Sequence, residues 1–263
     1  YLPVAGRRLR VFYHDGAGQA PHNPALLLIH GVGGNYLHWP SHLRRLPGIN
    51  VVALDLPGHG DSEGPGADTV AGYAAVVRDV ADVLGLDRAV VAGHSLGAAI
   101  ALDYARRYPT STAGLAVLAG GVRLPVPDGL IDALRTDFAR STEQIIDNGY
   151  AGGAPPHLRE VLLKRLRANA PQTLIGDYGA CAAFDAAPFA SQITAPALVV
   201  SGREDRIVPP ELGAALHDLL PQSELHWLDD AGHMVMLEQP GAVTALLTDF
   251  VMQAYAARRT HSE

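Results

Sequence analysis

A serine between two glycines follows a short apolar run near the middle of the chain. Residues 91–97 read Val-Ala-Gly-His-Ser-Leu-Gly, with Ser95 at the centre of a Gly-x-Ser-x-Gly pattern. A strand that ends in this pattern and continues into a helix is a nucleophile elbow, a tight turn that lifts the serine hydroxyl toward a substrate. Gly93 and Gly97 leave out side chains where the strand and helix backbones approach each other. Taken alone, the pattern also fits an ordinary glycine-rich turn between a strand and a helix.

A serine hydroxyl attacks a carbonyl efficiently only when a neighbouring base removes its proton, and that base is oriented by an acid. His233 follows an apolar run at residues 224–228, and Asp205 follows another at 197–201. If both runs are parallel strands, their carboxyl ends lie at the same edge of a sheet as the elbow. The chain order serine, acid, histidine is the order expected after a nucleophile elbow. We therefore predict Ser95, Asp205 and His233 as a catalytic triad.

Other residues compete for the roles of acid and base. Glu204, Asp229 and Asp230 lie in the same two loops, and the sequence leaves each of them open as the acid or as a solvated loop charge. Among the twelve histidines, His94 directly precedes the nucleophile and is expected to point away from it. The preferred pair remains Asp205 with a histidine at the end of the next strand.

A glycine-rich loop after the first continuous apolar run supplies the remaining requirement of acyl transfer, a pair of N–H donors for the oxyanion. Residues 30–34 read His-Gly-Val-Gly-Gly. We predict the backbone N–H of Val32 as one donor and that of Leu96, at the start of the helix after the elbow, as the second. The alternative, a phosphate-binding loop, lacks the Lys-Ser/Thr of a Walker motif and the spacing of Gly-x-Gly-x-x-Gly. His30 and His59, both in loops, are expected to have structural roles.

Composition limits the class of protein and its partners. The chain has 263 residues, 48% of them hydrophobic, which suits one large α/β domain with an appended lid. A net charge of −7 with dispersed basic residues makes nucleic acid an unexpected partner. Cys181 is the single cysteine, so we expect a small core residue, no intrachain disulfide and no metal site. The absence of a long apolar run and of a signal-peptide core predicts a cytoplasmic protein that does not span a membrane.

Short apolar runs alternate with helical patterns along the chain, which is typical of a mostly parallel sheet covered by helices on both faces. Strands are predicted at residues 9–14, 25–30, 51–55, 89–92, 114–119, 197–201 and 224–228. Helices are predicted at 69–84, 98–108 and 240–257. The fold class is therefore α/β.

The alternation stops for about 70 residues after position 121, with no convincing strand. A structureless loop of that length is not expected in a compact domain. Apolar spacing predicts three or four short helices there, separated by residues 149–156 and by Pro171. We interpret residues 122–194 as a helical cap over the carboxyl ends of the strands, and residues 1–121 and 195–263 as the core. The alternative is a helical excursion without a role in binding.

These motifs resemble those of capped members of the α/β-hydrolase superfamily. The matching segments are residues 30–34, 55–62 (Asp-Leu-Pro-Gly-His-Gly-Asp-Ser), 93–97, 202–209 and 232–240, in the family's order. The resemblance implies an α/β-hydrolase fold with a mostly parallel eight-stranded sheet and a helical cap inserted after the sixth strand. It also implies hydrolysis without a cofactor and the same triad of serine, aspartate and histidine.

Differences from related subfamilies narrow the range of reactions expected for this chain. Epoxide hydrolases and haloalkane dehalogenases of this fold carry Asp at the elbow, where this chain has Ser95. The carbon–carbon hydrolases typically have Trp after the catalytic histidine and a Gly-Pro-Gly element in the oxyanion loop, whereas Met234 stands here. We therefore predict a serine carboxylesterase, acting on a small-molecule ester or lactone through an acyl-enzyme. The alternatives are a carbon–carbon hydrolase acting on a diketone-type substrate, an acyltransferase, and a ligand-binding sensor with a hydrolase pocket. The sequence does not indicate an oligomeric state.

Overall fold

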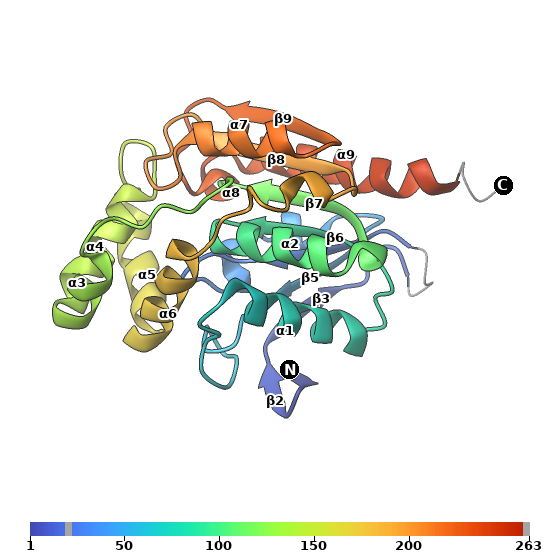
Figure 1. The fold of residues 1–263 in the computed structure, drawn as a ribbon. Helices are drawn as coiled ribbons and strands as arrows, with labels where there is room; N and C mark the ends of the chain where they lie inside the picture. Colours follow the sequence, from blue (N-terminus) through green and yellow to red (C-terminus); the bar gives the residue numbers. More distant parts are fainter. Residues whose placement is uncertain (19–22, 260–263) are drawn as a thin grey trace.

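A mostly parallel sheet runs through the centre of the chain, as the alternation of apolar runs and helical patterns predicts (Figure 1). The computed structural model describes residues 1–18 and 23–259. Within these residues the main sheet has seven strands in the order β3-β5-β4-β6-β7-β8-β9, and only β3 pairs antiparallel with its neighbour. The strands are β3 (Val11–His14), β4 (Ala25–Ile29), β5 (Asn50–Leu54), β6 (Ala89–His94), β7 (Thr112–Leu118), β8 (Ala197–Gly202) and β9 (Ser223–Leu228).

The described main sheet is one strand smaller than the eight strands that the resemblance implies. The first residues form a separate hairpin of β1 (Leu2–Val4) and β2 (Arg7–Leu9). A tight turn at Ala5 and Gly6, both with positive φ, folds the chain back on itself, and Val4 and Leu9 are buried in the core on the side of helix α1. The strand predicted at residues 9–14 is therefore divided. The helical segment consequently follows the fifth strand of the main sheet in chain order, rather than the sixth.

Both faces of the sheet are buried, because successive strand residues point to opposite sides. One core contains Leu27 and Ile29 together with α1 (Val70–Val83), α2 (Leu96–Arg107) and α7 (Pro210–Leu219). The other contains Leu26 and Leu28 with the elements of the opposite face. Those elements are the 3-10 helices η1 (Tyr36–His38) and η2 (Leu43–Arg45), and the α-helices α8 (Val235–Glu238) and α9 (Pro240–Arg259).

Four helices fill the long stretch between β7 and β8, in agreement with the predicted number. They are α3 (Leu130–Thr136), α4 (Phe138–Asn148), α5 (Pro156–Arg167) and α6 (Pro171–Ala182). They lie together beyond one end of the sheet, and α6 also contacts α2 of the core (Figure 1). We call residues 122–194 the α3–α6 segment. Their action as a cap stays a prediction.

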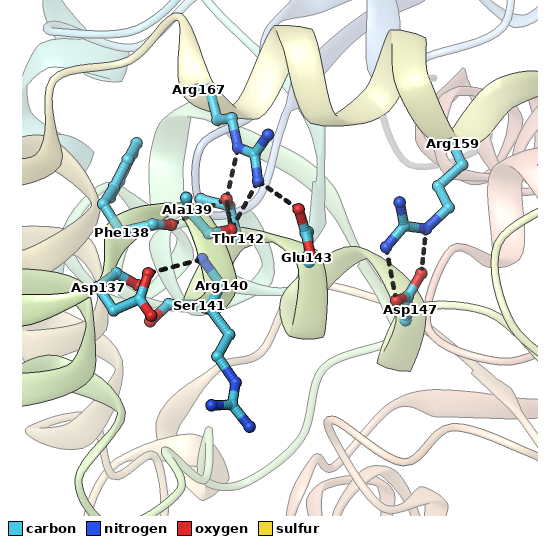
Figure 2. A network of polar contacts seen from close by, with 10 residues as sticks. All are labelled: Asp137, Phe138, Ala139, Arg140, Ser141, Thr142, Glu143, Asp147, Arg159 and Arg167. Carbon is cyan, nitrogen blue, oxygen red and sulfur yellow. Dashed lines mark hydrogen bonds and ion pairs between the residues drawn. The ribbon is translucent and has the colours of Figure 1, made fainter.

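Polar contacts join α4 to α5 within this segment (Figure 2). The Arg167 guanidinium donates to the Thr142 hydroxyl at 2.8 Å and lies 3.0 Å from a Glu143 carboxylate oxygen. Nearer the end of α4 and the start of α5, Arg159 binds Asp147 through two nitrogens, at 2.8 and 2.9 Å. These contacts hold the two helices in one register.

The short helices η3 (Pro109–Ser111) and η4 (Ala190–Gln192) complete the fold. No helix in the described part of the chain has the length and apolar character needed to cross a membrane.

Candidate active site

Ser95 stands at a sharp turn between β6 and α2. Its φ of 56° and ψ of −119° are outside the regions that residues with a side chain normally adopt. The turn is possible because Gly93 and Gly97 have no side chain. A Cβ atom at Gly93 would collide with the main chain of Gly97, and one at Gly97 would collide with the carbonyl of Ile29. The predicted geometry of a nucleophile elbow is present.

The loops after β8 and β9 bring Asp205 and His233 together. The Nδ1 of His233 lies 2.9 Å from Oδ2 of Asp205, and both side chains are buried. The other carboxylate oxygen accepts hydrogen bonds from the backbone N–H groups of Ile207 and Val208, both at 2.9 Å. Because the carboxylate accepts on both oxygens, it is held in one orientation and favours the tautomer with a proton on Nδ1. The Nε2 atom of His233 is then free to accept a proton.

The competing acids lie elsewhere. Asp229 forms an exposed ion pair with Arg203 at 2.6 Å. Glu204 and Asp230 are exposed, and Asp230 occupies a turn with a φ of 53°. None of these three carboxylates is hydrogen-bonded to His233 in the described residues.

The two predicted oxyanion donors have no competing partner. In the described chain, neither the N–H of Val32 nor that of Leu96 donates to another protein group. The loop of Val32 lies directly against the elbow, since a Cβ atom at Gly31 would be only 2.9 Å from Cβ of Ser95. A tight turn, in which the Gly34 N–H donates to the Gly31 carbonyl at 3.0 Å, shapes this loop.

His94 does not point away from the site, contrary to the expectation from its place in the sequence. Its ring lines the same pocket as Ser95 and lies 4.7 Å from the ring of His233, centroid to centroid. The Nε2 of His94 donates to the main-chain carbonyl of His233 at 2.9 Å. Burial, together with the nearby His233, holds the pKa of His94 well below its ordinary value. The strained turn at Ser95 explains the difference, because simple alternation along β6 does not continue through it.

A largely apolar pocket opens above Ser95 and His233. Its floor includes Gly31 and Val32, and most of its apolar wall comes from the α3–α6 segment. The side chains from that segment are Leu124, Pro125, Ile145, Ile146, Tyr150, Leu162, Leu166, Tyr178 and Cys181. Burial raises the pKa of Cys181, so this thiol stays protonated and acts as an apolar wall residue rather than a second nucleophile. Among the described residues, no cluster of histidine, cysteine or acidic side chains could hold a metal ion.

Comparison with known proteins identifies the family of this chain. The profile of the alpha/beta hydrolase family matches residues 26–246, which is most of the chain. The chain belongs to the alpha/beta hydrolase family. Its sequence is 31% identical to that of a 2-hydroxy-6-oxononadienedioate/2-hydroxy-6-oxononatrienedioate hydrolase of Paraburkholderia phymatum, over 94% of this chain and 93% of the relative. It is 32% identical to a pimeloyl-(acyl-carrier protein) methyl ester esterase of Neisseria meningitidis, over 85% of this chain and 91% of the relative.

A solved structure shows the same fold. An esterase from Thermogutta terrifontis superposes with a TM-score of 0.84 over 97% of this chain and 98% of its own, at 24% sequence identity. At that identity the likeness concerns the fold. The predicted alpha/beta hydrolase fold is therefore confirmed.

In this alpha/beta hydrolase, one residue that supports the site was missed from the sequence. Glu238 on α8 accepts the N–H groups of Gly232 and Met234, both at 3.1 Å, and these residues flank His233. Its other oxygen accepts the Ala151 N–H of the α3–α6 segment at 2.8 Å. Glu238 lies within the matching segment 232–240, but a glutamate shortly after a histidine is equally typical of a solvated surface charge.

Proposed function

We propose that this alpha/beta hydrolase cleaves a carboxylic ester through an acyl-enzyme on Ser95. The observation that carries the proposal is the buried pair of Asp205 and His233, of which His233 lines one pocket with a serine in strained backbone geometry. A histidine oriented by a buried carboxylate and placed beside a serine at an elbow is the arrangement that activates a hydroxyl for acyl transfer.

The reaction has two halves. His233 takes the Ser95 proton on Nε2 as Oγ attacks the ester carbonyl, and the Val32 and Leu96 N–H groups stabilise the oxyanion that forms. Collapse of the tetrahedral intermediate breaks the bond to the leaving alkoxide, which receives the proton from His233. Water then attacks the acyl-enzyme with the same histidine as base, and the acid and free enzyme are released. Throughout both halves, Asp205 orients the imidazole and stabilises its charged form.

The relatives support a hydrolase but point to more than one substrate class. The methyl ester esterase favours an ester, and the apolar pocket wall fits an apolar acyl or alcohol group. A second candidate, hydrolysis of a carbon–carbon bond, is supported by the relative from Paraburkholderia phymatum. The position after His233 favours the ester, because Met234 stands where such hydrolases typically have Trp.

A substrate screen with matched variants tests the proposal. We expect the wild-type protein to hydrolyse p-nitrophenyl esters of graded acyl length, and Ser95→Ala to lose up to about a million-fold in kcat. The exposed Ser191→Ala serves as the matched control and should keep wild-type rates. Full ester hydrolysis by Ser95→Ala would overturn the assignment. Turnover of vinylogous diketones but not of esters or lactones would favour the carbon–carbon hydrolase. Labelling of Ser95 by a fluorophosphonate without any turnover would favour a ligand-binding sensor.

A further inference from the structure

A buried carboxylate in the α3–α6 segment takes no part in the chemistry proposed above. Asp177 on α6 is fully buried, and both its oxygens accept hydrogen bonds. Oδ1 accepts from the Tyr73 hydroxyl at 2.6 Å, and Oδ2 lies 2.8 Å from Nε2 of His59. Burial of a carboxylate is costly unless it is paired and hydrogen-bonded, and these two contacts offset that cost for Asp177.

His59 supplies the compensating charge. Its Nδ1 faces the Pro57 carbonyl at 3.0 Å while its Nε2 faces Asp177, so both ring nitrogens point at acceptors and both carry protons. Burial is the largest single influence and lowers the pKa of His59, but the charge and hydrogen bond of Asp177, the Pro57 carbonyl and the charge of Asp55 together outweigh it. The pKa of His59 therefore lies above its ordinary value. The result is an ion pair between the core loop after β5 and a helix of the α3–α6 segment.

The same carboxylate reaches the oxyanion loop. Oδ2 of Asp177 also accepts the N–H of Gly33 at 3.3 Å, and the carbonyl of Gly33 accepts from Nδ2 of Asn169 at 2.9 Å. Thus Asp177 and Asn169, both in the α3–α6 segment, form hydrogen bonds with the backbone N–H and the backbone carbonyl of Gly33. The close approach needs a residue without a side chain and with positive φ, since a Cβ atom at Gly33 would collide with Leu166.

These contacts determine how Val32 presents its N–H. The peptide before Val32 is held through its carbonyl, at Gly31, which accepts from Nδ1 of His30 at 2.8 Å. The peptide after Val32 is held through its N–H, at Gly33, by Asp177. With the peptide planes on both sides restrained, the direction of the Val32 N–H is restrained as well.

We propose that Asp177 is a positioning residue for the oxyanion hole, through which docking of the α3–α6 segment on the core aligns the Val32 N–H. The inference rests on the proposed function, because Val32 matters only if an oxyanion forms at Ser95. A donor aimed at developing charge stabilises the transition state more than the bound substrate. Loss of alignment therefore lowers kcat with little change in KM.

The test compares two carboxylate deletions. We expect Asp177→Ala to lower kcat for a p-nitrophenyl ester by about 10-fold to 100-fold, somewhat less than removal of a donor, with KM within about threefold of wild type. The Ki of a trifluoromethyl ketone, which forms a tetrahedral adduct with the serine, should rise by a similar factor. Asp103→Ala is the matched control, because Asp103 is also a buried carboxylate, whose ion pairs within residues 1–18 and 23–259 are with Arg106 and Arg107 on its own helix, α2. It should lower the unfolding midpoint without lowering kcat of the folded enzyme.

A second variant covers the case in which Asp177→Ala does not fold. Asn169→Ala leaves the ion pair intact and removes the donor to the Gly33 carbonyl, together with the hydrogen bonds of the same amide to the Arg165 and Leu166 carbonyls at the end of α5. A smaller loss in kcat, about threefold to tenfold, is expected. Wild-type kcat and Ki in folded Asp177→Ala, or in Asn169→Ala if that is the only folded variant, would overturn the proposal. Equal losses of kcat in Asp177→Ala and Asp103→Ala would overturn it too. Failure of the proposed function is separate, because it would appear in the wild-type protein, either as Ser95 that a fluorophosphonate does not label or as labelled Ser95 without ester turnover.

Discussion

The Nε2 of His94 donates a hydrogen bond to the main-chain carbonyl of His233 across 2.9 Å. The residue before the nucleophile thus holds the backbone of the proposed base, and the elbow and the loop after β9 are joined at the site. The lowered pKa of His94 keeps this ring neutral, and the contact then requires the tautomer with its proton on Nε2.

Replacement of His94 by phenylalanine tests this link. The ring would remain against His233, but the buried carbonyl would lose its donor, at a cost of about 1–3 kcal/mol in the free energy of unfolding. We expect His94→Phe to unfold at lower urea concentration and to have a reduced kcat, because the base becomes less well positioned. Unchanged stability and unchanged kcat would show that the hydrogen bond contributes to neither.

Substitution of the proposed acid should affect the rate far more than the fold. Asp205→Asn can keep the acceptor for Ile207 and Val208 but presents an amide N–H₂ group to His233, which favours the wrong imidazole tautomer. We expect kcat to fall by about 10³–10⁴ with a retained unfolding midpoint. Asp229→Asn, in which only an exposed ion pair with Arg203 is lost, is the control and should keep full activity. Similar rates in the two variants would exclude Asp205 as the orienting acid.

A single methyl group in the oxyanion loop should disturb the elbow. In Gly31→Ala the new Cβ would lie 2.9 Å from Cβ of Ser95 and 3.0 Å from Nδ1 of His94, so the loop must move away. We expect at least about a 10-fold loss of kcat in steady-state assays, since a shifted loop misaligns the Val32 N–H. Gly241→Ala on α9 meets no atom within 4 Å and should leave the rate unchanged. Wild-type kcat in Gly31→Ala would contradict a role for this loop in catalysis.

The loop that carries His233 should depend on Glu238. The carboxylate accepts three backbone N–H groups, from Gly232, Met234 and Ala151, whereas the side chain of Glu238→Gln has one acceptor oxygen. We expect a loss of about 1–3 kcal/mol in the free energy of unfolding and a lower kcat. The exposed Glu160→Gln provides the matched control, which should change neither quantity. A wild-type kcat in folded Glu238→Gln would show that the loop keeps its position without the carboxylate.

Mild acid should destabilise the protein through its neutral histidines. Burial, aided by the positive charges of Arg165 and His59, lowers the pKa of His38 from 6.5 to about 4. Between these two values the unfolded chain binds a proton that the folded protein does not, so stability falls as the pH is lowered below 6.5. His38 contributes at most about 2 kcal/mol of this loss between pH 7 and pH 5. His30 and His94 act in the same direction.

Urea unfolding at the two pH values measures this effect. The loss of stability between pH 7 and pH 5 should be smaller in His38→Leu than in the wild-type protein. An identical loss in both proteins would show that His38 titrates alike in the folded and unfolded states.

Local sequence was sufficient for the six parallel strands of the main sheet, the elbow and the glycine-rich turn at residues 30–34. Continuous apolar runs predict strands buried on both faces, and the glycines around Ser95 mark a turn that only glycine permits. The chain order of the acid and the base also follows from the sequence, because parallel strands end at one edge of the sheet. These features depend on residues close together in the chain.

The tertiary structure decided which of these residues meet. The choice of Asp205 over its neighbours depends on how two loops face each other, and the inward direction of His94 depends on the strained turn beside it. The contact between Asp177 and Gly33 joins residues that are 144 positions apart. No local pattern encodes such a contact, because it exists only once the α3–α6 segment has packed against the core.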